Sequence, residues 1–304
     1  MKIKLLFLLL LVSTGAFAQS DTKLTAQLNQ LVSGFNGQVG VYVQNLKTGR
    51  TAEISADTLF PTASMIKVSI LCGLMDKIDK GQLDYHQKMV FRDSLRYDTG
   101  DILGSVKDND TIQLSKVAML MITMSDNTAS LWLQKLVTGA YINSWLQQNG
   151  FVNTRVNSGV KGRELMHSRY GWGVTTPREM CRLFTLIRLG QAVSPAASER
   201  MYRDLSHIYW DDNALSQIPP YIAAASKQGF VDESRSETVL VNAPHGDYVF
   251  SIITKHQKDK TYKHDNEGFV LIRNVSALLW YYFEPGSKWQ QAAGYDKFMN
   301  TDDE

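Results

Sequence analysis

A serine and a lysine three positions apart, Ser64 and Lys67, are the first residues whose types and spacing could do chemistry. On a helix this spacing places both side chains on one face, so the lysine amine can reach the serine hydroxyl. A serine hydroxyl is a weak nucleophile that needs an adjacent base, and a lysine becomes a base when burial or another cation destabilises its charged form. The same S-x-x-K pattern occurs at Ser20 and Ser158, but only Ser64 follows a Pro-Thr stop and opens an apolar helix. Ser64 is therefore the leading candidate for a nucleophile.

Two further short motifs follow along the chain. Residues 125–127 read Ser-Asp-Asn and lie between two expected helices, where all three residue types also favour the ordinary role of a helix N-cap. Residues 227–229 read Lys-Gln-Gly and end an expected strand, where a glycine allows another backbone to approach closely. Taken singly, the first motif is explained as well by capping and the second by a surface lysine. Their order along one chain is more specific than any motif alone.

The ordered set S-x-x-K, S-D-N and K-x-G resembles the signature of class A β-lactamases and penicillin-binding proteins. Ser125 follows Ser64 by 61 residues, and Lys227 follows Ser125 by 102. The text around the motifs also resembles that family, over about residues 24 to 283. The matching segments are residues 38–49, 60–64, 121–129 and 174–177.

This resemblance implies a role for each residue. Ser64 would attack a carbonyl carbon and become acylated, and Lys67 would activate it directly or through water. Ser125 would pass a proton to the leaving nitrogen. Lys227 would bind the substrate carboxylate and lower the basicity of Lys67 through its like charge. The remaining implied contacts are Asn127 with the substrate amide, and the backbone N–H groups of Ser64 and Phe230, beside Gly229, as an oxyanion hole.

Hydrophobic periodicity predicts strands near both ends of the chain and helices between them. The expected strands are 39–43, 51–55, 222–229, 238–242 and 248–254, and the expected helices are 24–35, 64–80, 114–123, 127–137, 141–148, 176–189 and 267–283. The simplest assembly is an α+β fold, an antiparallel five-stranded sheet flanked by the N- and C-terminal helices beside a helical lobe. The family resemblance implies the same fold.

The chain is expected to contain a signal peptide and one catalytic domain. Residues 1–18 combine two lysines, an apolar run and an Ala-Phe-Ala cleavage site, which is typical of secretory signals. Residues 19–304 would form the domain, with a sheet lobe at about 24–57 and 215–283 and a helical lobe at about 58–214. We therefore predict a periplasmic or secreted protein without a membrane anchor.

Charge and cysteine content narrow the possible partners. Removal of residues 1–18 takes away two lysines, so the formal net charge falls from +2 to 0 and leaves no basic footprint for nucleic acid. The six histidines lack metal-ligand spacing, so we expect neither a metal nor a cofactor. Export would permit a disulfide between Cys72 and Cys181, but two buried thiols are the simpler expectation. We expect a monomer that acts on a small molecule.

The third motif departs from the family's pattern, because Gln228 stands where the family has serine or threonine. A glutamine amide can still donate a hydrogen bond, but from a different place than a short hydroxyl. Its bulk can also narrow the site expected for the substrate carboxylate.

A second departure concerns the residue that activates water. Class A β-lactamases use a glutamate in an E-x-x-L-N pattern to hydrolyse the acyl-enzyme, and this sequence lacks that pattern. The corresponding position falls on Val160 or Lys161, and the nearby acid Glu164 is three or four residues out of register. A rearranged loop could bring Glu164 into the site, but we expect a solvated charge. His167 is a weaker substitute, because a single loop histidine is usually exposed and titrates near neutral pH.

Three other side chains have two interpretations each. Tyr97 could lie at the lip of the cleft or be an exposed structural tyrosine. Arg235 could help to bind the substrate carboxylate, but an arginine at a strand edge is expected to be solvated. Trp172, between two glycines, is expected to anchor its loop by packing.

The sequence supports three functions that share this site. The leading one is an exported β-lactamase-type serine hydrolase, possessing the parts for acylation but lacking a clear base for deacylation. The second is a DD-peptidase or esterase that acts on cell-wall peptides. The third is a non-catalytic sensor of β-lactams or peptidoglycan, against which the complete set Ser64, Lys67, Ser125 and Asn127 argues.

Overall fold

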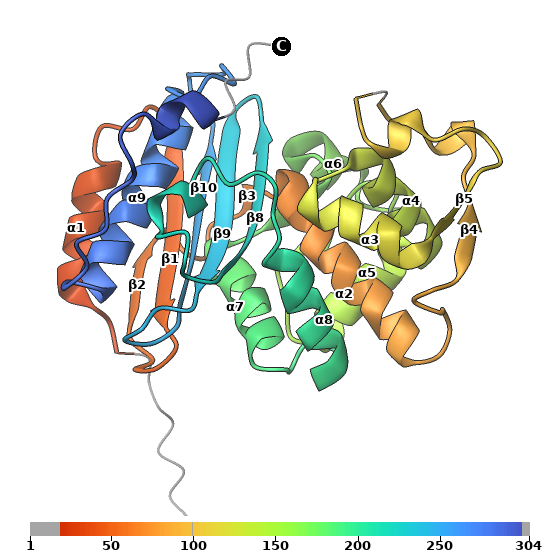
Figure 1. Ribbon diagram of the computed structural model, residues 1–304, viewed down its shortest axis with the longest axis horizontal. Helices are drawn as coiled ribbons and strands as arrows, with labels where there is room; N and C mark the ends of the chain where they lie inside the picture. Colours follow the sequence, from red (N-terminus) through yellow and green to blue (C-terminus); the bar gives the residue numbers. More distant parts are fainter. Residues whose placement is uncertain (1–18, 99, 300–304) are drawn as a thin grey trace, which may run out of the picture.

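The computed structural model describes residues 19–98 and 100–299, so the expected signal peptide lies outside the described residues. The chain forms the predicted α+β fold, with a five-stranded antiparallel sheet in the order β2-β1-β10-β9-β8 (Figure 1). Strands from both ends of the chain are therefore direct neighbours. The strands are β1 (Gln38–Asn45), β2 (Thr51–Ile54), β8 (Ala224–Val231), β9 (Ser234–Val241) and β10 (Tyr248–Lys255).

Helices cover both faces of this sheet. The terminal helices α1 (Thr22–Val32) and α9 (Glu267–Phe283) lie together on one face, as Figure 1 shows. The opposite face packs on α7 (Pro177–Arg188) and, beyond it, on the helical lobe. Apolar side chains such as Leu28, Phe250 and Trp280 form one buried cluster under the terminal helices, and a second cluster joins the other sheet face to the helical lobe.

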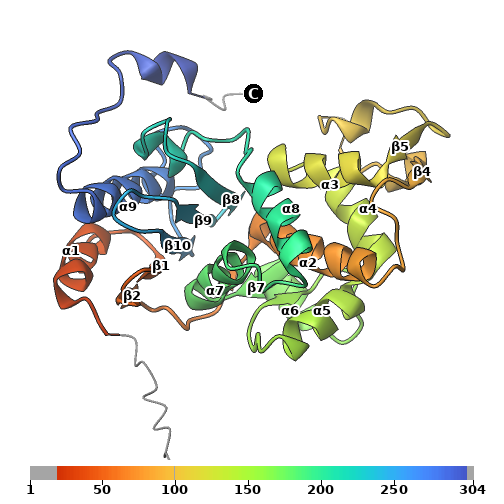
Figure 2. The same cartoon turned by 60° about the horizontal axis from the view of Figure 1, so that its bottom comes forward.

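The helical lobe contains the elements expected for the middle of the chain (Figure 2). Within the described residues, no helix is long and apolar enough to cross a membrane. The helices of this lobe are α2 (Ile66–Asp79), α3 (Leu114–Thr123), α4 (Asn127–Val137), α5 (Gly139–Gln148), α6 (Glu164–Tyr170) and α8 (Pro195–Leu205). The short strands are β3 (Phe60–Pro61), β4 (Lys88–Val90), β5 (Thr111–Gln113), β6 (Arg155–Val156) and β7 (Gly173–Thr175).

Local sequence signals explain several helix starts. The Thr176 hydroxyl accepts a hydrogen bond from the Glu179 N–H at 3.2 Å, and Pro177 occupies the first turn of α7, as the sequence predicts. Helices α6 and α8 were not predicted from the sequence. Helix α8 also begins with a proline, capped by Ser194, but α6 has only seven residues and no buried side chain. Such a short exposed helix gives no apolar periodicity to detect.

The turn that carries Ser64 is pressed against strand β8. Ala63–Met65 forms a single 3₁₀ turn before α2, and Ala63 adopts a left-handed backbone with φ 43°. Gly229 of β8 lies against this turn so closely that an added Cβ would be 2.6 Å from the Thr62 carbonyl oxygen and 2.8 Å from the Ser64 nitrogen. Only a residue without a side chain permits this approach of two backbones.

We predict that Gly229→Ala lowers the stability of the fold. The new methyl group would meet backbone atoms that cannot rotate away, and such overpacking costs about 1–3 kcal/mol. For a chain of this size, each kcal/mol lowers the melting temperature by about 2–4 °C. Gly286→Ala is the matched control, because a Cβ at Gly286 meets no atom within 4 Å. Calorimetry that gives equal melting temperatures for the two variants would contradict this account of the contact.

Candidate active site

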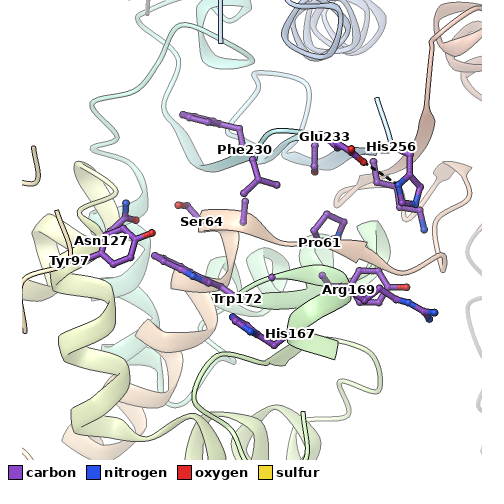
Figure 3. A pocket seen from close by; sticks show the side chains of 16 residues that line it. Pro61, Ser64, Tyr97, Asn127, His167, Arg169, Trp172, Phe230, Glu233 and His256 are labelled. Carbon is purple, nitrogen blue, oxygen red and sulfur yellow. Dashed lines mark ion pairs between the residues drawn. The ribbon is translucent and has the colours of Figure 1, made fainter. Parts of the chain in front are cut away.

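Ser64 lies where the two lobes meet, at the junction of two cavities. Its half-buried side chain lies between Asn127 and Phe230 (Figure 3), and these three residues line both cavities. The larger cavity, of about 810 Å³, extends along the edge of β8 toward the end of β10. The smaller cavity, of about 540 Å³, is also lined by Ser125 and Gln228. A substrate held at Ser64 can thus extend in two directions.

Two buried lysines share one serine hydroxyl. The Lys67 Nζ lies 3.1 Å from the Ser125 Oγ and 2.7 Å from the Asn127 Oδ1, and it also donates to the Ser125 carbonyl oxygen. The Lys227 Nζ approaches the same Ser125 Oγ at 3.0 Å. Both lysine side chains are fully buried. The structure therefore brings together Lys67, Ser125, Asn127 and Lys227, four residues that are far apart in the sequence.

Burial makes both amines easier to deprotonate. Loss of solvation lowers the pKa of Lys67 to about 7, although the carboxylates of Asp101 and Asp126 act in the opposite direction. Burial also lowers the pKa of Lys227 well below its usual value, and the positive charge of Lys67 lowers it further. We expected burial or a neighbouring cation to lower the basicity of Lys67, with help from the like charge of Lys227, and burial is the main cause. An amine with a pKa near 7 can accept a proton at neutral pH.

The loop that carries Ser125 is held by two carboxylates at the start of α4. Asp126 accepts hydrogen bonds from the N–H groups of Ala129 at 2.7 Å and Leu103 at 2.9 Å. Asp101 accepts from the N–H groups of Asn127 at 3.0 Å and Thr128 at 2.7 Å. These acids complete the helix N-terminus. The loop is thereby fixed with Ser125 in a left-handed backbone conformation, φ 56°, that few serines adopt.

Gln228 fills the place beside Lys227. Its side chain is buried, and its Oε1 faces the Lys227 Nζ at 3.4 Å. The Nε2 end of the amide is then the donor that remains for a ligand in the smaller cavity. On the neighbouring strand β9, the buried Glu237 accepts hydrogen bonds from the Ser226 hydroxyl at 2.6 Å and the Ala214 N–H at 2.8 Å. Burial raises the pKa of Glu237 to about 7.

Trp172 packs against the core of the helical lobe, as expected for a loop anchor, and it also lines the larger cavity. Its indole ring lies 5.9 Å from the Lys67 Nζ and makes an edge contact with the Tyr97 ring, whose centroid is 5.5 Å away. Both rings line the larger cavity beside Ser64 (Figure 3). Gly173 permits this position, because a Cβ there would be 2.7 Å from the Ile66 Cδ1 and the Thr62 Oγ1. The two glycines that flank Trp172 were the one sequence feature that indicated close packing around this ring.

Of the residues considered as a base for water, only His167 is among the described residues that line a cavity with Ser64. Glu164 is exposed, and its Oε1 accepts from the Gly162 N–H at 2.9 Å at the start of α6. Lys161 is exposed, whereas Val160 packs against the helical-lobe core. Glu164 is absent from the described lining of either cavity, whereas the exposed His167 lines the larger one. The expectation of a solvated Glu164 agrees with this position.

Arg235 and the cysteines have structural surroundings. Arg235 is fully buried rather than solvated, and its guanidinium donates to the Ser234 carbonyl oxygen at 3.0 Å and lies 4.8 Å from the Phe269 ring centroid. Arg235 is not among the described residues that line either cavity. Cys72 and Cys181 are free buried thiols, so they form no disulfide. Within the described residues, no group of three or more His, Cys, Asp or Glu could hold a metal ion.

Comparisons with known proteins agree with this geometry. The chain matches the beta-lactamase enzyme family over residues 23–283. The β-lactamase VEB-1 of Pseudomonas aeruginosa is 22% identical over 92% of this chain and 97% of its own length. The β-lactamase AER-1 of Aeromonas hydrophila is 25% identical over 62% of this chain and 63% of its own length.

Solved structures share the fold. PBP-A is 27% identical, with a TM-score of 0.78, over 88% of this chain and 98% of that chain. A PBP-A mutant described in an acyl-enzyme complex with penicillin G is 28% identical, with the same TM-score of 0.78 and the same coverage of 88% and 98%. A β-lactamase from Sphaerobacter thermophilus has the same fold, with a TM-score of 0.76 at 20% identity over 87% of this chain and 98% of that chain. Since the family match spans most of the chain, the protein belongs to the beta-lactamase enzyme family.

Proposed function

We propose that this protein is an exported serine hydrolase that opens β-lactam rings through a Ser64 acyl-enzyme and releases the acyl group slowly. The observation that carries the proposal is the Ser125 hydroxyl, held between the buried amines of Lys67 and Lys227 in the wall of a cavity that Ser64 also lines. That arrangement supplies a base and a proton path for acylation. Export rests on residues 1–18, and the enzyme would act as a monomer on a small molecule.

Acylation uses the residues at the junction of the cavities. The Ser64 Oγ attacks the lactam carbonyl carbon, and its proton passes to the neutral Lys67 amine directly or through water. The backbone N–H groups of Ser64 and Phe230, next to Gly229, stabilise the developing oxyanion. The C–N bond then breaks, and the leaving nitrogen takes a proton through Ser125. Asn127 holds the substrate amide, and Lys227 with Gln228 holds its carboxylate.

Deacylation lacks an equivalent buried base, because the substitute His167 lines the larger cavity but is exposed. Water must attack the Ser64 ester, and a general base contributes about 10²–10⁴ to such a step. Among the described residues that line the larger cavity, Glu233 is the only one with a carboxylate. It pairs with Lys260 at 2.6 Å and His256 at 3.5 Å. The Trp172 ring, an apolar group without a proton acceptor, lies beside Lys67 in the wall of the same cavity. These observations support a long-lived acyl-enzyme.

A second function would use the same site on D-Ala-D-Ala peptides or esters. It is favoured by the missing base and by the likeness to PBP-A, a mutant of which forms an acyl-enzyme with penicillin G. A non-catalytic sensor is the third, and the complete set Ser64, Lys67, Ser125 and Asn127 argues against it. Attack on a peptide carbonyl would follow the same steps, with an amino acid as the leaving group.

We predict a burst with a chromogenic cephalosporin, followed by slow turnover. The burst should match the enzyme concentration because acylation is fast and deacylation is not. Glu164→Gln should leave the slow phase within about twofold, since the Glu164 carboxylate lies at the exposed start of α6. Stopped-flow absorbance on both proteins measures this. Steady turnover without a burst, lost in Glu164→Gln, would show that Glu164 reaches the acyl-enzyme.

We predict that the acylation rate rises with pH through about 7 and then levels off. Lys67 must be neutral to accept the Ser64 proton, and burial lowers its pKa to about 7, so the active form grows as pH rises through that value. Lys67→Ala should slow acylation about 100-fold or more and remove this pH dependence. The measurement is the second-order rate constant of penicillin labelling between about pH 5 and about pH 9. An unchanged profile in Lys67→Ala would assign the base to another group.

A further inference from the structure

The larger cavity continues well past Ser64 and ends among cationic side chains. Figure 3 shows Tyr97, Asn127 and Trp172 at the Ser64 end, and Arg169 and His256 at the other end. Lys255, the last residue of β10, lines the same end. The cavity therefore changes character along its length, from aromatic walls beside the nucleophile to a positively charged terminus.

This cavity is the one that receives the acyl part of a substrate. The step rests on the proposed function, in which Ser125 protonates the leaving nitrogen. Ser125 and Gln228 line the smaller cavity, so the leaving nitrogen and the substrate carboxylate belong there. The group on the other side of the attacked carbonyl must then extend along the larger cavity, past Phe230 and toward β10.

Two cations at the far end have free hydrogen-bonding capacity. Arg169 has neither an ion pair nor a hydrogen bond within the part of the chain that the structure describes, and it lies close enough to Lys255 to lower the pKa of that amine, after the larger effect of burial. The Lys255 Nζ donates to the Leu59 carbonyl oxygen at 2.7 Å and rests 4.8 Å from the Phe60 ring centroid. An ammonium group has three donors, so further donors remain for a ligand.

The acid at this end is already occupied. Glu233 binds Lys260 through one oxygen at 2.6 Å and faces His256 through the other at 3.5 Å. It therefore neutralises its own neighbours rather than Arg169 or Lys255. An unpaired guanidinium beside a second cation is a favourable place for a carboxylate, which can accept two parallel hydrogen bonds from arginine.

We propose that the larger cavity selects acyl donors with a carboxylate at the end remote from Ser64, held by Arg169 and Lys255. The carboxylate could belong to the side chain of a β-lactam or to a peptide, and the chemistry of recognition is the same. Arg169 and Lys255 would thus determine specificity without touching the reacting atoms. Neutral acyl chains of equal length would occupy the cavity but leave the cations unpaired.

The test uses penicillins made by acylating 6-aminopenicillanic acid with succinic, glutaric or adipic acid. Each is paired with the compound in which only the side-chain carboxyl group is a methyl ester. The series measures how far the carboxylate must reach. At one chain length the acid should acylate Ser64 about 5- to 20-fold faster than its ester, as a charged hydrogen bond at a partly exposed site would give. The preference should fall in high salt, because solvent-exposed charges are screened.

Variants separate charge recognition from reactivity. Arg169→Gln should reduce the acid's rate to that of its ester and leave the ester's rate unchanged. Lys255→Gln, which keeps a donor for the Leu59 carbonyl oxygen, should reduce the preference in the same way. Arg203→Gln is the matched control, because Arg203 is an exposed arginine of α8 paired with Glu199. It should keep the full preference.

A second series attaches the same acyl groups to D-alanyl-D-alanine and measures release of D-alanine. A preference for the acid in either series, removed by Arg169→Gln, supports the inference and identifies the source of the carboxylate. Labelling of Ser64 with equal rates for acid and ester at every length, and no preference among the peptides, overturns it while the proposed function stands. If neither series reacts at all, the proposed function fails and this inference fails with it.

Discussion

The arrangement of the site depends on one hydroxyl shared by two buried amines. Lys67 comes from α2 and Lys227 from β8, and both reach the Ser125 Oγ, at 3.1 and 3.0 Å. Burial and the repulsion between two nearby positive charges disfavour the state in which both amines are protonated, and so favour a neutral amine. Three features hold this geometry: the carboxylates that cap α4, the close contact of Gly229 with the Ser64 turn, and the packing of α2 in the helical lobe.

In the proposed reaction, this arrangement of buried amines supports acylation better than deacylation. Acylation needs a base and a proton donor at Ser64, and in our proposal Lys67 and Ser125 fill these roles. Deacylation needs a base for the attacking water, and the rings of Trp172 and Tyr97, which line the larger cavity with Ser64, supply none. The carboxylates that line the two cavities have other partners. Asp98 accepts from the Gly100 N–H, and Asp101 and Asp126 accept from backbone N–H groups of α4 and the loop before it. Glu233 binds Lys260. We therefore propose that acylation of Ser64 is faster than deacylation.

The sequence predicted the fold well because its strands and long helices repeat apolar residues with clear periods. The five strands and helices such as α3 and α4 lie at or near their expected residues. The order of the three motifs along the chain also identified the residues that meet around Ser125. Secondary-structure propensities alone could not have done so, because they carry no information about which distant motifs belong together. The short helix α6 lacked a buried face. The position of Trp172 depends on close packing of Gly173 against α2, and the two flanking glycines alone do not specify that contact. The burial of Arg235 was missed for a similar reason, because its partners are backbone carbonyls and the rings of Tyr262 and Phe269.

The most direct test of this account is the intact mass of the protein over time after a brief exposure to penicillin G. The account predicts a rapid mass increase of one penicilloyl group, its persistence long after free penicillin is removed, and no increase in Ser64→Ala. A penicilloyl adduct on Ser64→Ala would contradict the nucleophile. An adduct on the wild-type protein that disappears as fast as it forms would contradict the unequal support for the two steps.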